Sequence, residues 1–377
     1  MISITTPAGG MILFTLGGLA GAVFALPFKQ VKGWAYESYW IFYAIFGLVL
    51  FPWYLAWLTV PNMIELLREA PTAVLARCCF FGALWGLGGL TWGLMIRYLG
   101  IGLGLAIGCG LCSATGTLIP PIMTGEAYEL VKNFGAFVVL FGVVLSLVGI
   151  VFVGMAGKAK EDELSYEQKR MAVAEFDFNK GMLVAVFSGI ASAGMNFGLQ
   201  SGKALQSAAI IGGTHDRWQG IPVLVVVLFG GFVVNFIWCL YQNVKNNTMG
   251  DYVNKRTPIL ANIIFAGMAG IIWAMQFVCQ KVGEPAMGRY GYIGFAIVMG
   301  SAIFFSSLVG ILLGEWKGVG RRTKVLLGLG IFTLIVSFGV ISYGNKIRPS
   351  SEHPTAELKR YVEKELQAVK EDMNIID

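Results

Sequence analysis

The stretch GMILFTLGGLAGA, from Gly10 to Ala22, returns as GMLVAVFSGIASA, from Gly181 to Ala193. A second match follows downstream, where Phe81 to Gly104 can be laid over Phe265 to Gly288. Self-similarity of this kind indicates a duplicated structural unit. If each copy contains five spans, the two copies must face opposite ways across a bilayer. Many secondary transporters use such inverted repeats to place a site near the midplane.

The composition is far too apolar for a soluble protein. Of the 377 residues, 56% are hydrophobic and 13% are charged, and the mean hydropathy is +0.69. Runs such as VLVVVLFGGFVVNFIW are continuously apolar, whereas a membrane barrel needs alternating polar and apolar positions. We therefore expect an all-α integral membrane protein with ten transmembrane helices of roughly 20 residues each. The expected spans are residues 8–28, 39–59, 78–96, 101–123, 135–156, 181–200, 221–241, 259–280, 292–313 and 325–343.

These spans divide into two inverted five-helix repeats, expected over residues 8–156 and 181–343. Between them, residues 157–180 read GKAKEDELSYEQKRMAVAEFDFNK, a charged connection that we interpret as a cytoplasmic linker. In the tail, residues 344–377, apolar side chains recur at spacings of three and four, which predicts an amphipathic helix.

The distribution of basic residues predicts the orientation. One set of alternate loops holds fifteen Lys and Arg residues, and the other holds seven before the tail. The positive-inside rule places the richer side in the cytoplasm, which leaves both termini on the outer, periplasmic side of a cell (inner) membrane.

Polar side chains inside apolar spans are the natural candidates for a site, because each is costly in hydrocarbon unless it has a partner or faces a cavity. Amides donate and accept hydrogen bonds, and an indole packs against the C–H face of a ring, so their mixture suits a neutral polyol such as a sugar. Hydroxyls in membrane helices often bond their own backbone instead. Gln280 lies one turn beyond Gln276 on the same face. The substrate-binding candidates are Thr91, Trp92, Asn196, Gln200, Trp273 and Gln276.

Charged side chains are scarce within the expected spans. No Asp or Glu lies deep in any of them, and Glu126 and Glu315, at equivalent span ends, are weak candidates for proton coupling. Lys281 also falls at a span end, where basic side chains ordinarily extend to the membrane surface.

Several classes of function have no support in the sequence. There is no phosphate loop, no HExxH motif and no nucleophile with its base, so we do not expect an enzyme. Cys109 and Cys112 have CxxC spacing without a partner His, and we interpret them as packing residues rather than metal ligands. We expect no cofactor, no metal and no nucleic-acid partner.

Seven segments together resemble the L-rhamnose-proton symporter family of the drug/metabolite transporter superfamily, over about residues 8–345. They are PFKQVKGWAYESYW (27–40), FGALWGLGGLTWGLMIRYLGIGLGLAIG (81–108), GTLIPPI (116–122), EFDFNKGMLVAV (175–186), SAGMNFG (192–198), WAMQF (273–277) and EWKGVGRR (315–322). The resemblance implies ten helices in two inverted repeats, a central sugar site and proton-coupled uptake. This chain departs from the family pattern at Gly89 and Thr91, where amides are expected, and at Gly291, where an acidic residue is expected.

The leading hypothesis is a secondary transporter that imports L-rhamnose or a related deoxysugar with a proton by alternating access. Its partners would be the sugar, the proton and the lipid bilayer. One alternative is an exporter of metabolites or drugs of the same superfamily, which predicts outward flux. Another is a membrane sugar sensor that does not transport, which predicts saturable binding without counterflow. The sequence leaves the exact sugar and the oligomeric state open.

Overall fold

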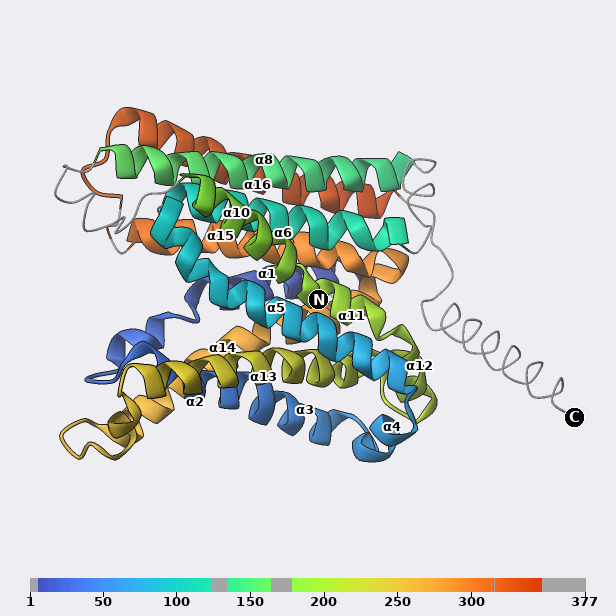
Figure 1. Cartoon of the computed structure of the whole chain (residues 1–377). Helices are drawn as coiled ribbons and strands as arrows, with labels where there is room; N and C mark the ends of the chain where they lie inside the picture. The colour runs from blue at the N-terminus through green and yellow to red at the C-terminus, as the bar shows by residue number, and fades with distance from the viewer. Residues whose placement is uncertain are drawn as a thin grey trace, which may run out of the picture.

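The computed structural model describes residues 6–99, 101–123, 134–163, 178–312, 314 and 316–347 (Figure 1). Helices account for nearly all of these residues, and no strand occurs among them. The expectation of an all-α protein is confirmed. The first-half elements are α1 (Pro7–Val23), η1 (Leu26–Gln30), α2 (Tyr36–Ala44), η2 (Ile45–Leu50), α3 (Phe51–Thr59), α4 (Met63–Glu69), α5 (Thr72–Leu99), α6 (Ile101–Met123) and α8 (Phe134–Asp162).

The second half contains several short helices between its long ones. Its elements are α10 (Phe178–Ser192), α11 (Gly194–Ser201), α12 (Lys203–Ile211), η3 (Asp216–Trp218), α13 (Ile221–Lys245), η4 (Met249–Val253), α14 (Ile259–Gly283), η5 (Glu284–Ile293), α15 (Gly294–Leu312) and α16 (Arg321–Lys346). Within the described residues, nine helical segments are long and apolar enough to cross a membrane, and Ile107–Ile119 of α6 is a shorter apolar helix. The protein is therefore a multi-pass membrane protein.

Small residues let the long helices approach each other closely. Helices α8 and α16 lie side by side along one edge of the bundle (Figure 1). A Cβ at Gly149 of α8 would lie 2.8 Å from Leu334 Cγ, and a Cβ at Gly330 of α16 would lie 2.9 Å from the main-chain N of Val153. Because association in lipid depends on van der Waals packing, glycines at such contacts stabilise the helix pair.

The expected span over residues 181–200 is not one continuous helix. The chain turns at Ala193 and again at Gly202, so that α11 is a short helix between α10 and α12. Backbone groups released at such breaks are tolerated at membrane depth only where protein or a cavity surrounds them. The breaks place the amide side chains of α11 inside the bundle.

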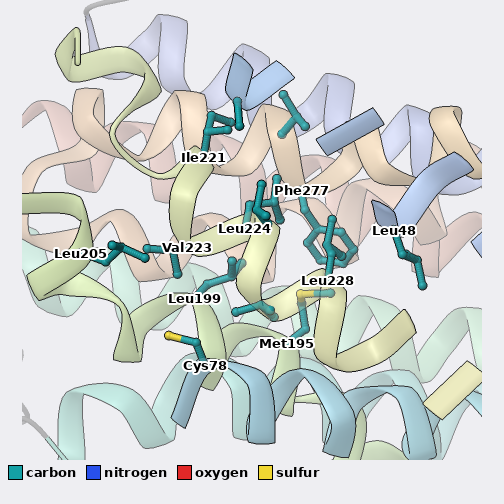
Figure 2. Close-up of a cluster of buried hydrophobic side chains, with 14 of the residues drawn as sticks. Leu48, Cys78, Met195, Leu199, Leu205, Ile221, Val223, Leu224, Leu228 and Phe277 are labelled. Carbon is teal, nitrogen blue, oxygen red and sulfur yellow. The ribbon is translucent and has the colours of Figure 1, made fainter. Parts of the chain in front are cut away.

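An apolar core fixes α11 from one side. Met195 and Leu199 of α11 are fully buried in the same cluster as Leu224 and Leu228 of α13 and Phe277 of α14 (Figure 2). The amides of α11 follow these two apolar residues by one position each, so they point in a different direction from the core.

A polar cluster joins the start of α2 to the connection between α13 and α14. Ser38 Oγ donates to Asp251 Oδ2 at 2.7 Å, and Asn246 Nδ2 donates to Glu37 Oε1 at 2.9 Å. The Asn262 side chain bonds both main-chain polar groups of Lys32, at 3.0 and 2.8 Å. These contacts hold three helix ends together at one end of the bundle.

The charged linker begins later than expected. Helix α8 continues past residue 156 to Asp162. Residues 164–177 of the linker and residues 348–377 of the tail lie outside the described part of the chain.

Candidate functional site

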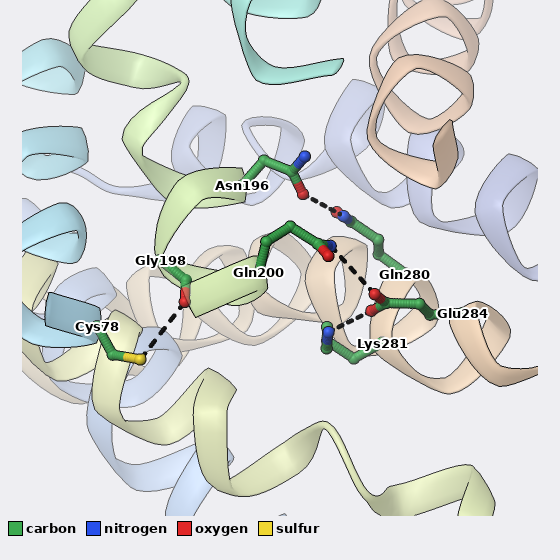
Figure 3. A network of polar contacts seen from close by, with 7 residues as sticks. All are labelled: Cys78, Asn196, Gly198, Gln200, Gln280, Lys281 and Glu284. Atoms are coloured by element: carbon green, nitrogen blue, oxygen red, sulfur yellow. Dashed lines mark hydrogen bonds and ion pairs between the residues drawn. The ribbon is translucent and has the colours of Figure 1, made fainter. Parts of the chain in front are cut away.

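Two amides of α11 enter a polar network inside the bundle. Asn196 has no exposed surface, and its Nδ2 donates to the main-chain O of Gly116 on α6 at 2.6 Å. Gln200, one turn later, donates from Nε2 to Glu284 Oε1 on η5 at 3.1 Å. Short helix α11 thereby connects to α6 through Asn196. It connects to η5 through Gln200, whose bond to Glu284 is drawn in Figure 3.

Gln280 of α14 completes the link between these helices. Its Nε2 donates to Asn196 Oδ1 at 3.2 Å, and the residue has no exposed surface. Its Oε1 is buried without a hydrogen-bond partner among the described residues. A buried polar atom without a partner requires an explanation, since nearly all such atoms in folded proteins are bonded. Gln280 therefore offers an acceptor to a hydroxyl group that reaches the network.

A buried ion pair lies at the end of the same network. Lys281 Nζ pairs with Glu284 Oε2, and the two side chains are 1% and 17% exposed. The expectation that Lys281 extends to the membrane surface is wrong. Helix α14 continues to Gly283 and passes directly into the 3-10 helix η5, so Glu284 lies about one turn beyond Lys281 on the same helical face. The aliphatic part of the Lys281 side chain packs against Gly220, because a Cβ added at Gly220 would lie 3.0 Å from Lys281 Cβ.

Trp273 packs among other aromatic rings. It stacks on Trp85 of α5 with ring centroids 5.0 Å apart and planes 24° apart. Phe277 lies 4.8 Å from it on the same helix, and Tyr43 of α2 lies 6.1 Å from it edge to face. This contact joins α5 to α14, which the sequence match of residues 81–104 with residues 265–288 predicts to be equivalent.

Gln276 is directed toward α1 rather than toward Asn196. The residue is 5% exposed, and a Cβ added to Gly21 would overlap Gln276 Oε1. The absence of a side chain at Gly21 therefore leaves the space that the Gln276 amide occupies. Of the two glutamines on this face of α14, Gln280 rather than Gln276 contacts α11.

Thr91 and Trp92 belong to a different contact, between α5 and α10. The hydroxyls of Thr91 and Ser188 are 2.6 Å apart, and Thr91 Oγ1 also donates to the main-chain O of Gly88 at 2.8 Å. Trp92 Nε1 donates to Ser192 Oγ at 2.8 Å. Ser192 ends α10, one turn before Asn196, so this contact lies beside the amide network without joining it.

The two carboxylates predicted as weak coupling candidates, Glu126 and Glu315, lie outside the described residues. Glu284 was not among the predicted site residues, because it follows the apolar run of α14 and the sequence there is typical of a loop. The available signal was the spacing of Lys281 and Glu284, since residues three apart share a helix face.

Further buried hydroxyls lie on the helices around the network. Ser113 and Thr117 of α6 and Ser301 of α15 have no hydrogen-bond partner among the described residues. Amides, hydroxyls and indole rings bind neutral hydroxylated molecules, while an ammonium and a carboxylate can also exchange protons. The site thus combines groups for a polyol with one ion pair.

The apolar helices and the polar network buried between them define a multi-pass membrane protein of the transport type. The chain matches the family described as L-rhamnose-proton symport protein over residues 5–346, and it belongs to that family. It is 32% identical to the L-rhamnose-proton symporter of Salmonella typhi over 339 residues, which cover 89% of this chain and 97% of that protein. It is 31% identical to the L-rhamnose-proton symporter of Cronobacter sakazakii, with the same coverage of both chains.

Proposed function

We propose that the protein is a secondary active transporter that imports L-rhamnose or a related deoxysugar together with a proton across the cell (inner) membrane. The observation that carries the proposal is the buried network of Asn196, Gln200 and Gln280, in which Gln280 Oε1 has no partner among the described residues. Family membership supports both the sugar and the proton. The chemistry is transport, and no bond of the sugar is made or broken.

We further infer that ten helices form two inverted repeats, as in the drug/metabolite transporter superfamily, and that the halves move against each other during alternating access. The packing supports this arrangement. Helix α1 packs on α14 and α15, and α10, which carries the matching sequence, packs on α5 and α6. Each proposed repeat thus packs its first helix against two helices of the other repeat, and these two pairs of helices correspond in the sequence comparison.

The proposed substrate wall contains Thr91, Trp92, Asn196, Gln200, Trp273 and Gln276, to which we add Gln280. The amides of α11 and α14 would bond the sugar hydroxyls. Trp273 would present a ring face to the apolar side of the sugar, where a deoxysugar carries its methyl group. A site that hydrogen-bonds a substrate strongly rejects analogues that lack the bonding group.

We also propose that both termini lie on the outer side, since the loops on the other side hold more Lys and Arg. A cysteine introduced in the connection between α13 and α14, for example Gly250→Cys, should react with a membrane-impermeant maleimide only from the cytoplasmic side. Labelling from the outside in intact cells would reverse the orientation.

The proposed function is tested by uptake of labelled L-rhamnose into proteoliposomes, with and without an inward proton gradient. The account expects accumulation above the external concentration only with the gradient. Counterflow against internal unlabelled sugar separates a transporter from a sensor, because a sensor binds without exchange. No accumulation of any deoxysugar would refute the substrate, and accumulation that is independent of the gradient would refute the coupling.

A further inference from the structure

Binding a neutral sugar does not require charged side chains, so the ion pair of Lys281 and Glu284 needs a separate explanation. Removing a charge from water is costly, and the attraction between two buried charges repays that cost only when their geometry is favourable. Ionisable groups inside a membrane bundle therefore mark ion and proton pathways more often than they stabilise the fold. Here the side chain of Lys281 is 1% exposed and that of Glu284 is 17% exposed. The pair lies next to the amides, and the Glu284 side chain is still partly exposed.

Both oxygens of Glu284 are engaged, each by a different element. Oε2 pairs with Lys281 Nζ of α14, and Oε1 accepts the bond from Gln200 Nε2 of α11 at 3.1 Å (Figure 3). Protonation of this carboxylate removes its attraction for Lys281 and converts one oxygen from acceptor to donor. A single proton at Glu284 therefore changes the contact between η5 and the helix that carries two of the proposed sugar-binding amides.

Glycine at position 291 leaves the space for this carboxylate. A Cβ added to Gly291 would overlap Glu284 Cγ and lie 3.2 Å from Glu284 Cδ. The Glu284 side chain thus occupies the volume that a side chain at position 291 would take. A carboxylate attached at either position would reach the same region of the site.

Other titratable groups near the pair are few in the described residues. Helix η5 packs against α1, α6, α14 and α15, and α14 also packs against η3. Neither α1 nor α15 carries a titratable side chain. The other elements carry the titratable or charged residues Cys109, Cys112, Asp216, Arg217, Cys279, Lys281, Arg289, Tyr290 and Tyr292. Cys78 of α5, which contacts Gly198 of α11, is added to this set. Lys281 is the member of this set whose bond to Glu284 is described, so it is the direct counter-ion.

We propose that Glu284 is the group that binds the coupled proton, with Lys281 as the residue that positions its ionised form. The inference rests on the proposed sugar-proton symport. A proton from water on the entry side binds a Glu284 carboxylate oxygen, and the same proton leaves to water on the exit side. Each cycle with a neutral sugar then carries one positive charge inward.

The first test compares full-length wild type, Glu284→Gln and the control Glu69→Gln, an exposed carboxylate on α4, in proteoliposomes. Glu284→Gln should lose gradient-driven accumulation of L-rhamnose and the dependence of uptake on external pH, yet retain counterflow. Glu69→Gln should match wild type. If Glu284→Gln accumulates sugar with the wild-type pH profile while wild type is proton-coupled, the inference fails and the proposed function stands. If wild type itself shows no proton-driven uptake, the proposed function has failed.

A relocated carboxylate provides the second test, which decides the case in which Glu284→Gln is inactive in both assays. In the double variant Glu284→Ala/Gly291→Asp, the new side chain enters the space that Glu284 vacates. Of the three atoms nearest to a Cβ at position 291, two belong to the Glu284 side chain and the third is the main-chain O of residue 284, at 3.2 Å. Gly291 is not among the glycines with positive φ. Return of proton-driven accumulation, absent in Glu284→Ala alone, supports the inference. Failure of accumulation to return overturns it.

Discussion

Lys281 and Glu284 form an ion pair inside the helix bundle, and Lys281 retains only 1% of its side-chain exposure. The pair lies where α14 passes into η5, and its carboxylate also accepts a hydrogen bond from Gln200 of α11. One contact thus sets the local course of the backbone and also reaches the amides proposed to bind the sugar. The stability and the transport activity of the protein should therefore respond to this pair in separable ways.

Lys281→Met should be strongly destabilising. The substitution leaves the Glu284 carboxylate buried without its counter-ion, and breaking a buried pair in this way costs about 3–5 kcal/mol. The double variant Lys281→Met/Glu284→Gln should recover part of that loss, because it leaves no uncompensated charge. Thermal unfolding in detergent, followed by tryptophan fluorescence, measures both effects. Equal loss in the single and double variants would show that the uncompensated carboxylate of Glu284 is not what destabilises Lys281→Met.

Asn196→Ala should impair transport more than its loss of stability explains. The variant removes the bond to Gly116 O and leaves Gln280 Nε2 without its acceptor, at a cost of roughly 1–3 kcal/mol. Asn235→Ala is the matched control, because Asn235 is also buried and bonds Trp40 Nε1 and Gly231 O outside the network. The unfolding temperatures of both variants should fall, while sugar counterflow should fall only in Asn196→Ala. Equal counterflow in the two variants would remove Asn196 from the substrate wall.

Gly21→Ala should weaken sugar binding indirectly, through Gln276, because residue 21 is not part of the proposed substrate wall. The added methyl group would overlap Gln276 Oε1 and displace the amide. Loss of one hydrogen bond worth roughly 1 kcal/mol raises the concentration for half-maximal uptake about fivefold. Gly339→Ala on α16 is the control, since an added Cβ meets nothing within 4 Å there. Unchanged half-maximal concentrations for Gly21→Ala would argue against a role for Gln276 in the wall.

The contact between α8 and α16 at Glu163 should depend on pH. Thr323 Oγ1 and the main-chain N–H of Gly320 each donate to the carboxylate at 2.7 Å. The bond from Thr323, followed by that from Gly320, lowers the pKa of Glu163 below its ordinary value of 4.5. A lowered folded-state pKa stabilises the protein above pH 4.5, and this stabilisation is lost as the pH falls through the folded-state pKa.

Hydrogen exchange in the first turn of α16 measures this contact. Protection of these amides should be present at neutral pH in wild type, fall in strong acid, and be reduced at neutral pH in Glu163→Ala. Glu69→Ala, at an exposed position on α4, should leave the same amides protected. Identical protection in Glu163→Ala and wild type at neutral pH would show that the carboxylate does not hold the two helices together.

The apolar runs of the sequence predicted most of the helices. In lipid the backbone must satisfy its own hydrogen bonds, which a continuous helix does. The break at Ala193 was not predicted, since neither proline nor a charged residue marks it in the sequence, whereas the break at Gly202 lies close to the expected end of the span at residue 200. Asn196 and Gln200 were predicted as site residues because amides are rare in apolar spans, and their role in substrate binding stays a prediction. The position of the tenth helix, the inverted repeats and the orientation stay predictions.

The charged part of the site was predicted less well, for a physical reason. Span ends were placed where apolarity stops, and Lys281 was therefore assigned to the membrane surface. The 3-10 helix η5 carries the polar sequence that follows back against α14, so the chain stays inside the bundle beyond its apolar stretch. Ion pairs between residues three apart can supply the compensation that a buried charge needs, and hydropathy does not register them.

The most direct test of sugar-proton symport measures both substrates together. Proteoliposomes with a weakly buffered external medium and a pH indicator receive L-rhamnose, while labelled sugar uptake is followed in parallel. The external medium should become more alkaline as the sugar enters, and a sugar that is not transported should produce no change. Entry of L-rhamnose without any movement of protons would contradict sugar-proton symport.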